Sequence, residues 1–238
     1  MSTIAIPEAP QYKEGKDNAG VIEIPACFPG YGTTLGNAIR RVLLSSLEGA
    51  AITSVRIKGV AHEFSAIDGV MEDVVQIILN LKQIRFRLHT DEKITATIKV
   101  KGEKEVTAAD IKAPSDLEVV DTSQHIATLT DKKASLEMEL TIEKGVGYVA
   151  SDQHLDNKED KTIDAIMIDA VYTPVRRVNY NVENMRVGKR TDYEKVTLEI
   201  VTDGSITPQE AFDSAVDILV EQFNALSSGG VETIVTEE

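Results

Sequence analysis

The chain has 238 residues, a formal net charge of -14 and one cysteine. This length holds one large domain or two modest ones, each able to bury its own core. No apolar run approaches the roughly 18 residues of a membrane-spanning helix, and Cys27 has no partner for an intramolecular disulfide, so we expect a soluble protein of the reducing cytoplasm. The acidity argues against direct nucleic-acid binding over a wide surface, because such binding releases counterions through lysine and arginine.

The first predicted helix spans Thr34 to Leu47 and is apolar on more than one side. At about 100° per residue, Leu44 lies about half a turn from Leu35, on the same side as Asn37 and Arg41. A large aliphatic side chain next to an arginine suits contact with a second protein. The alternative is a helix buried in its own domain, with Leu44 under a loop. The main stripe comprises Leu35, Ala38, Ile39, Val42, Leu43 and Leu47.

Glycines surround the start of this helix. The run from Gly30 to Gly36 resembles a loop that cradles a phosphate, because glycines let backbone N–H groups approach an anion. Its spacing matches neither the GxGxxG nor the GxxxxGK[ST] pattern, so a tight turn into the helix is the other interpretation. We expect Thr33 or Thr34 to be the N-cap and Gly49 to lie just past the end of the helix.

Three segments alternate apolar and polar residues with a period of two, namely Ile94 to Val100, Leu136 to Ile142 and Val196 to Ile200. This alternation is typical of half-buried strands in an antiparallel sheet. A second helix is predicted from about Val70 to Lys82, packed on a sheet. The helices are too few for a parallel sheet, so the predicted fold class is α+β.

A capping box, Thr207-Pro208-Gln209-Glu210, opens the last predicted helix, which closes near Gly229-Gly230 before a fraying tail from Val231 to Glu238. The apolar side chains of this helix cover about 200°, whereas a helix lying on one sheet needs little more than about 100°. Excess apolar surface on the first and last helices predicts a homodimer in which both helices pack across a two-fold axis. A single thick core is the alternative.

Breaks in the pattern at Gly49 and at Thr173-Pro174 divide the chain. If the first and last helices share a domain, residues 1–48 and 175–238 form a discontinuous dimerisation and assembly domain of antiparallel sheet plus two helices. Residues 49–174 then form an inserted, mostly antiparallel β domain that carries one helix. We expect a loop within this insert from Ser151 to Lys161.

No pattern typical of a catalytic or metal site is found. His62-Glu63 does not open an HExxH motif because residue 66 is alanine, the four histidines lack ligand spacing, and one cysteine cannot build a typical structural zinc site. No serine lies in a GxSxG motif. We therefore expect no active site, metal or cofactor in this chain. The segment from Val175 to Arg190 is basic against an acidic background, which is typical of a solvated face or of a protein-docking surface.

Four long blocks carry a family resemblance: GYGTTLGNAIRRVLLSSL, HEFSAIDGVMEDVVQIILNLK, HIATLTD and TPVRRVNYNVENMRVGKRTDYEKVTLEIVTDGSITPQEA. Together they resemble the amino-terminal domain of the bacterial RNA polymerase alpha subunit over nearly the entire chain. The resemblance implies a non-catalytic subunit of a DNA-directed RNA polymerase, a nucleotidyltransferase. In that family this domain homodimerises through a helix pair and scaffolds assembly of the beta and beta prime subunits, which hold the active site and its magnesium.

Two other functions stay open on the residues alone. One is a phosphate- or nucleotide-binding enzyme that uses the Gly30 to Gly36 loop, and the other is a stand-alone dimeric regulator. The chain also departs from the family at Phe28-Pro29, where Glu-Arg is common, and at Val146, where arginine is common, so we expect local contacts there to differ. The DNA-binding functions of the family's C-terminal domain are not carried over.

The helix pattern and the resemblance together define two predicted sets of site residues. The predicted dimer interface comprises Leu35, Ile39, Val42, Leu43, Phe212, Leu219, Phe223 and Leu226. The predicted docking surface for beta and beta prime comprises Asn37, Arg41, Leu44, His62, Glu63, Phe64, Ser65, Arg176, Arg177, Arg186 and Arg190.

Overall fold

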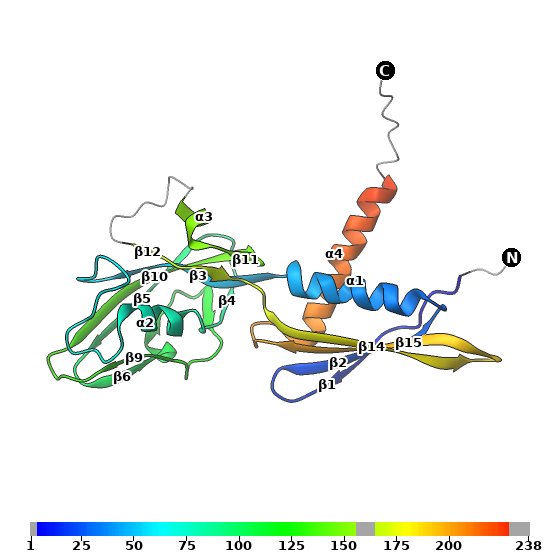
Figure 1. Ribbon diagram of the computed structural model, residues 1–238, viewed down its shortest axis with the longest axis horizontal. Coiled ribbons are helices and arrows are strands. Elements are labelled where there is room, and N and C mark those ends of the chain that lie inside the picture. The colour runs from blue at the N-terminus through cyan, green and yellow to red at the C-terminus, as the bar shows by residue number, and fades with distance from the viewer. Residues whose placement is uncertain (1–3, 156–164, 229–238) are drawn as a thin grey trace, which may run out of the picture. The chain divides into compact units, whose positions relative to one another are not determined.

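The computed structural model describes residues 4–155 and 165–228 (Figure 1). Internal contacts divide the chain into two compact units. Both units combine antiparallel strands with helices, which confirms the predicted α+β class. Among the described residues, no helix is long and apolar enough to cross a membrane. Unit 1 consists of Met1–Leu47, Val175–Thr202 and Ile206–Glu238, and unit 2 consists of Glu48–Pro174 and Asp203–Ser205.

The predicted domain boundaries differ from these units at Glu48 and at Asp203–Ser205, both of which belong to unit 2. Hydrogen bonds explain the second difference. The N–H of Asp203 donates to the carbonyl of Pro174 at 2.9 Å, and the Nε of Arg87 donates to the carbonyl of Ser205 at 2.9 Å. The short segment Asp203–Ser205, which follows β15 (Arg190–Thr202), therefore belongs to unit 2.

Unit 1 is built on a four-stranded antiparallel sheet in the order β1-β2-β15-β14. Its strands are β1 (Gln11–Glu14), β2 (Ala19–Cys27), β14 (Val175–Val187) and β15. One face of the sheet is apolar because the strand residues alternate, and α1 and α4 contribute to the core on that face. Fully buried members of this core are Cys27, Leu43, Val196, Leu198, Ile200, Ala211 and Ala215.

Helix α1 (Tyr31–Ser45) begins three residues before the predicted start. Its N-cap is Gly30, whose φ of 85° is readily adopted only by glycine, so the prediction of a threonine N-cap is wrong. The helix ends with the N–H of Ser46 bound to the carbonyl of Val42. Gly49 instead lies in a strand of unit 2, where a Cβ would stand 1.7 Å from the carbonyl oxygen of Tyr172.

Helix α4 (Pro208–Ser228) begins where the capping box predicts. The N–H of Thr207 donates to Glu210 Oε2 at 2.9 Å, and the N–H of Glu210 donates back to Thr207 Oγ1 at 3.2 Å. These two bonds satisfy backbone donors that a helix start otherwise leaves open. The predicted close at Gly229-Gly230 and the tail beyond it lie outside the described residues.

Unit 2 contains a seven-stranded antiparallel sheet in the order β7-β5-β10-β3-β4-β8, with β12 also paired to β3. The buried and exposed residues of its long strands alternate, so one face carries the core and the other carries charged side chains. Its strands are β3 (Glu48–Ile57), β4 (Phe86–Leu88), β5 (Ile94–Lys101), β7 (Ile111–Lys112), β8 (Leu117–Val119), β10 (Ser135–Val146) and β12 (Ile166–Met167).

Smaller elements complete unit 2. Two short ribbons pair β6 (Lys104–Thr107) with β9 (His125–Leu129), and β11 (Tyr148–Val149) with β13 (Ala170–Val171). A 3-10 turn spans Ala108–Asp110. A five-residue helix, α3 (Ser151–Leu155), occupies the beginning of the predicted Ser151 to Lys161 loop, so unit 2 carries more than the single helix predicted.

Helix α2 (Val74–Leu81) is shorter than the predicted Val70 to Lys82 because Asp73 caps it. The Asp73 carboxylate accepts the N–H of Gln76 at 2.7 Å, which fixes the first turn. Val70 instead forms an isolated bridge with Leu129 of β9. The apolar stripe of α2 packs into the core as the periodicity predicts, with Val74, Ile77 and Leu81 fully buried.

We expect Thr207→Ala to lower the stability of unit 1 by about 1 kcal/mol, because it removes the cap of α4. This loss corresponds to about 2–4 °C in a thermal melt. Thr33→Ala is the matched control, since Thr33 is exposed at the start of α1 and no side chain caps that helix. Equal losses from the two substitutions would contradict the assigned N-caps.

Candidate functional site

The glycine turn before α1 holds a carboxylate from its own unit. The N–H groups of Gly30 and Gly32 donate to the two carboxylate oxygens of Glu194 on β15, at 3.0 and 2.8 Å. A Cβ on Gly32 would lie 2.7 Å from one of those oxygens, so glycine is needed there for close approach. The position where a helix start would hold a phosphate is therefore filled by Glu194, and the phosphate-binding interpretation of this loop has no support.

The exposed side of α1 carries part of the predicted docking surface. Asn37 and Arg41 are exposed, whereas Leu44 is half-buried and packs against the core of unit 1. The neighbouring Arg40 is used inside the unit, because its Nε donates to the carbonyl of Val178 at 3.2 Å. Of the two adjacent arginines, Arg41 is therefore the more exposed.

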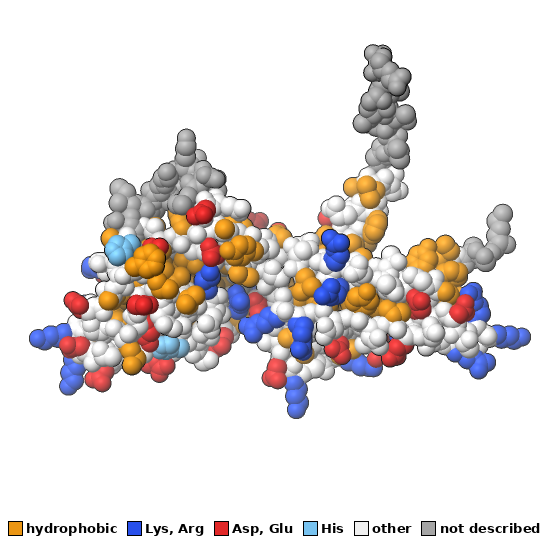
Figure 2. All heavy atoms as spheres, in the orientation of Figure 1, with side chains coloured by type: hydrophobic (Ala, Val, Ile, Leu, Met, Phe, Trp, Pro, Cys, Tyr) orange, Lys and Arg blue, Asp and Glu red, His pale blue; other side chains and the backbone are white. Residues whose placement is uncertain are grey.

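The apolar arc of α4 exceeds what unit 1 covers. Val220, Phe223 and Leu226 have exposed fractions of 50%, 63% and 76%. In Figure 2, hydrophobic side chains lie uncovered along the part of α4 that extends beyond the sheet of its unit. Such a row of large apolar side chains marks an interaction surface.

The predicted dimer interface needs a correction. Leu43 is fully buried, and Ile39 and Phe212 are nearly so, in the core of unit 1 itself. These three side chains have almost no surface to offer a second copy, so their role is to stabilise unit 1. The other predicted interface residues keep exposed or half-exposed surface, namely Leu35, Val42, Leu219, Phe223 and Leu226.

In unit 2, the predicted docking residues lie on the loop between β3 and α2. Phe64 has an exposed fraction of 80%, and His62 is also exposed. Ser65 is structural as well as accessible, because its carbonyl accepts the N–H of Val74 at the start of α2 and its hydroxyl lies 3.2 Å from His62 Nδ1. The loop is thus held in place while Phe64 is left free to contact a partner.

The side of α2 that adjoins this loop carries apolar residues beyond the predicted stripe. A cavity of about 400 Å³ is lined by His62 and Glu63 of the loop and by Val75, Ile78 and Leu79 of α2. Ile78 belongs to the stripe predicted from the sequence and packs against the core, whereas Val75 and Leu79 lie outside that stripe and are apolar, which is a signal that the sequence contains. The structure therefore joins part of the predicted docking loop to an apolar groove of the same unit.

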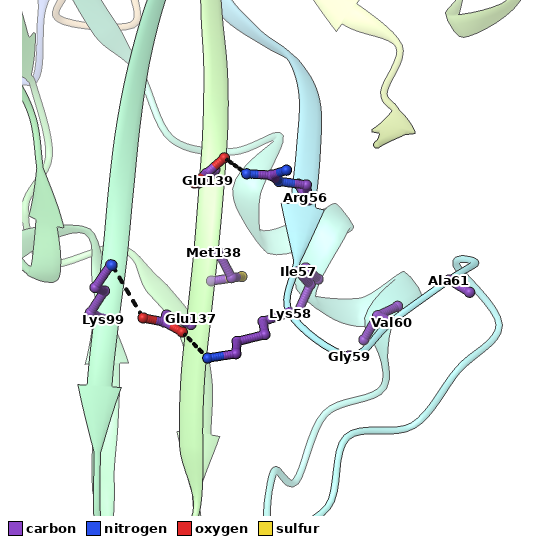
Figure 3. Close-up of a pocket in the computed structure, with 10 residues that line it drawn as sticks. All are labelled: Arg56, Ile57, Lys58, Gly59, Val60, Ala61, Lys99, Glu137, Met138 and Glu139. Atoms are coloured by element: carbon purple, nitrogen blue, oxygen red, sulfur yellow. Dashed lines mark hydrogen bonds and ion pairs between the residues drawn. The ribbon is translucent and has the colours of Figure 1, made fainter. Parts of the chain in front are cut away.

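A second cavity of unit 2 is lined by charged residues of β3, β5 and β10 and of the segment that follows β3. It has a volume of about 560 Å³, and its charged lining residues pair with one another (Figure 3). Hydrogen bonds from Lys58, at 2.8 Å, and from Lys99 lower the pKa of Glu137 to about 2, and Arg56 pairs with Glu139. Among residues 4–155 and 165–228, no three potential ligands are grouped to hold a metal ion.

Comparison with known proteins decides the family. The family model described as RNA polymerase Rpb3/RpoA insert domain matches residues 55–173, which is half of the chain and falls within unit 2. The chain belongs to the bacterial RNA polymerase alpha-subunit family. The resemblance stated from the sequence blocks is thereby confirmed.

Curated relatives named DNA-directed RNA polymerase subunit alpha extend the match beyond the insert. The protein of Moorella thermoacetica is 53% identical over 205 residues, covering 86% of this chain and 64% of the relative. That of Symbiobacterium thermophilum is 50% identical over 212 residues, covering 88% and 66%. That of Limosilactobacillus reuteri is 48% identical over 208 residues, covering 87% and 66%. The chain thus spans slightly less than two thirds of the length of these relatives.

The basic segment of this family member forms β14 and the turn that follows it. Arg176, Arg177 and Arg186 are exposed, and Arg186 Nε donates to the carbonyl of Gly188 at 2.9 Å. Arg190 is engaged internally, because two of its nitrogens bind the Asp192 carboxylate at 3.0 and 2.7 Å. These bonds raise the pKa of Arg190.

Two aromatic rings also contact Arg190. Its guanidinium carbon lies 5.5 Å from the ring centre of Phe28 and 5.0 Å from that of Tyr193. Phe28 belongs to the Phe28-Pro29 pair, at which we expect local contacts to differ from those of the family. Because stacking and ion pairing both hold the guanidinium, Arg190 contributes to the β14–β15 hairpin and has less freedom to bind a partner than Arg176 and Arg177.

In unit 2, a cluster of one histidine and two glutamates links β9 to the segment before α2. His125 Nε2 lies 2.9 Å from Glu72, and Nδ1 lies 3.0 Å from Glu105 on β6. Only a protonated imidazole donates from both nitrogens, and the bond to Glu72 is the main cause that raises the pKa of His125. Burial opposes ionisation of Glu72, but hydrogen bonds from Thr128 and His125 outweigh it and lower the pKa of Glu72.

These shifts predict a pH-dependent contribution to stability. The pKa of His125 is raised from 6.5, so its contribution is complete below about pH 6.5 and is lost as pH rises through the raised value. The pKa of Glu72 is lowered from 4.5, so its contribution is lost as pH falls below about 4.5. The cluster therefore stabilises unit 2 most at about pH 5–6.

We expect His125→Gln to destabilise unit 2 by about 1 kcal/mol near pH 5.5, with a smaller effect at pH 8.5. Denaturant unfolding at several pH values measures this difference. His89→Gln is the control, because the exposed His89 pairs with no carboxylate among the described residues. A loss that is the same at every pH would contradict a charged His125.

Proposed function

We propose that this chain works as the non-catalytic alpha subunit of a bacterial DNA-directed RNA polymerase in the cytoplasm. In this proposal it homodimerises through unit 1 and scaffolds the assembly of beta and beta prime, and the nucleotidyl transfer takes place in those large subunits. Its curated relatives are named DNA-directed RNA polymerase subunit alpha, which supports the proposal. Two further features suit a scaffold better than an enzyme. The charged residues that line the unit 2 cavity pair with one another, and Glu194 occupies the place at the start of α1 where an anionic ligand would bind.

The observation that supports the proposed dimer is the exposed apolar row on α4, which consists of Val220, Phe223 and Leu226. Burying one such leucine or phenylalanine contributes roughly 1.5–3 kcal/mol, so leaving Val220, Phe223 and Leu226 in water is costly. A two-fold axis lets the same row on a second copy cover it, because an isologous interface uses one patch twice. The half-buried Leu35, Val42 and Leu219 extend the proposed interface.

We assign docking of the large subunits to surfaces on both units. On unit 1 they are the exposed side of α1, with Asn37 and Arg41, and the basic strand β14. On unit 2 the surface is the loop that presents Phe64, together with the adjoining apolar side of α2. Exposed arginines and aromatic side chains are frequent at the energetic centres of protein interfaces. The net charge of -14 favours protein partners over direct contact with DNA.

We expect Phe223→Glu to convert the dimer into a monomer at micromolar concentration, because it places a charge in the apolar row. Analytical ultracentrifugation measures this change. Ser214→Glu is the matched control, since Ser214 is exposed and lies about 180° around α4 from Phe223. A native chain that sediments as a stable monomer would overturn the proposed dimer.

We expect Arg41→Glu to weaken capture of the large subunits about thirtyfold or more, because an interface arginine of this kind often contributes about 2 kcal/mol of binding. Reconstitution with purified beta and beta prime measures the loss. Lys16→Glu makes the same charge change at an exposed turn of unit 1 and should leave capture unchanged. Melting temperature and dimer state should stay native in both variants, and equal loss of capture would contradict the assignment.

A further inference from the structure

Strand β14 forms an open edge of the sheet in unit 1. The strand order β1-β2-β15-β14 leaves β14 with one paired neighbour, β15. β14 is 13 residues long, which is well above the usual strand length. An edge strand presents unpaired backbone N–H and C=O groups, so a second chain can add to it as a further strand.

One hydrogen bond shows which residues point outward from this edge. The carbonyl of Val178 accepts Arg40 Nε, so it points away from β15. In an antiparallel strand the N–H and C=O of one residue point to the same side, and alternate residues share that side. Tyr180, Val182 and Asn184 therefore also direct their backbone groups outward, and no described residue hydrogen bonds to them there.

Irregularities in the β14–β15 pairing limit the part of β14 to which a further strand could be added. The β14–β15 register shifts between Val175 and Arg177 and again between Met185 and Val187. Bulges of this kind bend a strand and end regular pairing. Arg40 covers the edge at Val178, so the regular and open stretch is centred on Tyr180, Val182 and Asn184.

The side chains along β14 make this edge basic. Arg176, Arg177 and Arg186 are exposed, and no carboxylate among the described residues forms an ion pair with them. The acidic residue of the strand, Glu183, is neutralised by Lys195 at 3.3 Å and binds the amide of Asn181. A partner segment with carboxylates is thus favoured, because it would meet unpaired arginines at both ends of the open stretch.

We propose that β14 binds an acidic, extended segment of a large polymerase subunit by strand addition, with backbone hydrogen bonds to Tyr180, Val182 and Asn184. This inference rests on the proposed docking of a large subunit at the basic strand, and it adds the mode of binding and the chemistry of the partner segment. A second copy of β14 is disfavoured as the partner, because like charges would face each other across the new pair.

Asn184→Pro tests the backbone bonds directly. Proline removes the N–H of residue 184, and that N–H points outward, so the β14–β15 ladder keeps its bonds. We expect binding of purified beta or beta prime to the native dimer to weaken about tenfold, as for the loss of one or two backbone hydrogen bonds. Asn184→Ala keeps the N–H and should bind normally. Melting temperature and dimer state should be native in both variants.

Hydrogen exchange and a charge variant separate the possible outcomes. In the complex, the amides of Tyr180, Val182 and Asn184 should exchange more slowly than in the free dimer, and the double variant Arg176→Glu, Arg177→Glu should weaken binding. If only the charge variant weakens binding and the amides stay fast, strand addition is wrong while the docking proposal stands. If the amides are already protected in the free dimer, a second copy occupies the edge. If neither large subunit binds the native dimer, the proposed function itself fails.

Discussion

The contact between Glu194 and the first turn of α1 is the constraint on which unit 1 depends. Its carboxylate accepts the N–H groups of Gly30 and Gly32 and so ties the helix to β15. This contact anchors the start of α1, and burial of the apolar stripe turns Leu43 into the core and leaves Arg41 exposed. The same contact fills the place that a phosphate would need. One internal interaction thus builds the proposed docking helix and removes support for the enzyme alternative.

Charge is distributed differently over the two units. On the open face of the unit 2 sheet, cross-strand pairs such as Lys58 with Glu137 satisfy charges within the chain. On β14 of unit 1, Arg176, Arg177 and Arg186 lack such partners among the described residues. Internally paired surface charges have little to offer a second protein, whereas unpaired arginines on a sheet edge combine charge with free backbone groups. We therefore place the strongest electrostatic attraction for a partner on β14.

The aromatic contacts at Arg190 separate this residue from the rest of the basic segment. Phe28 and Tyr193 flank the guanidinium, and Asp192 binds it from the same hairpin. Arg190 was predicted to dock a partner because it belongs to a basic run, but its interactions are internal. Phe28 thus takes part in holding the Arg190 guanidinium. The basic segment therefore has two parts. The arginines of β14 form no ion pair among the described residues, whereas Arg190 supports the β14–β15 hairpin.

The sequence by itself determined the α+β class, the strands β5, β10 and β15, the start of α4 and the family, because these follow from local periodicity, a capping box and long blocks that resemble the family. Periodicity also predicted which helix faces are apolar. Tertiary structure decided how deeply each face is buried, and it placed Phe212 in the core while leaving Phe223 exposed on the same helix. It also decided the start of α1, since Gly32 is bound by a carboxylate 162 residues away. No local pattern encodes such a contact, because it exists only when distant segments pack together.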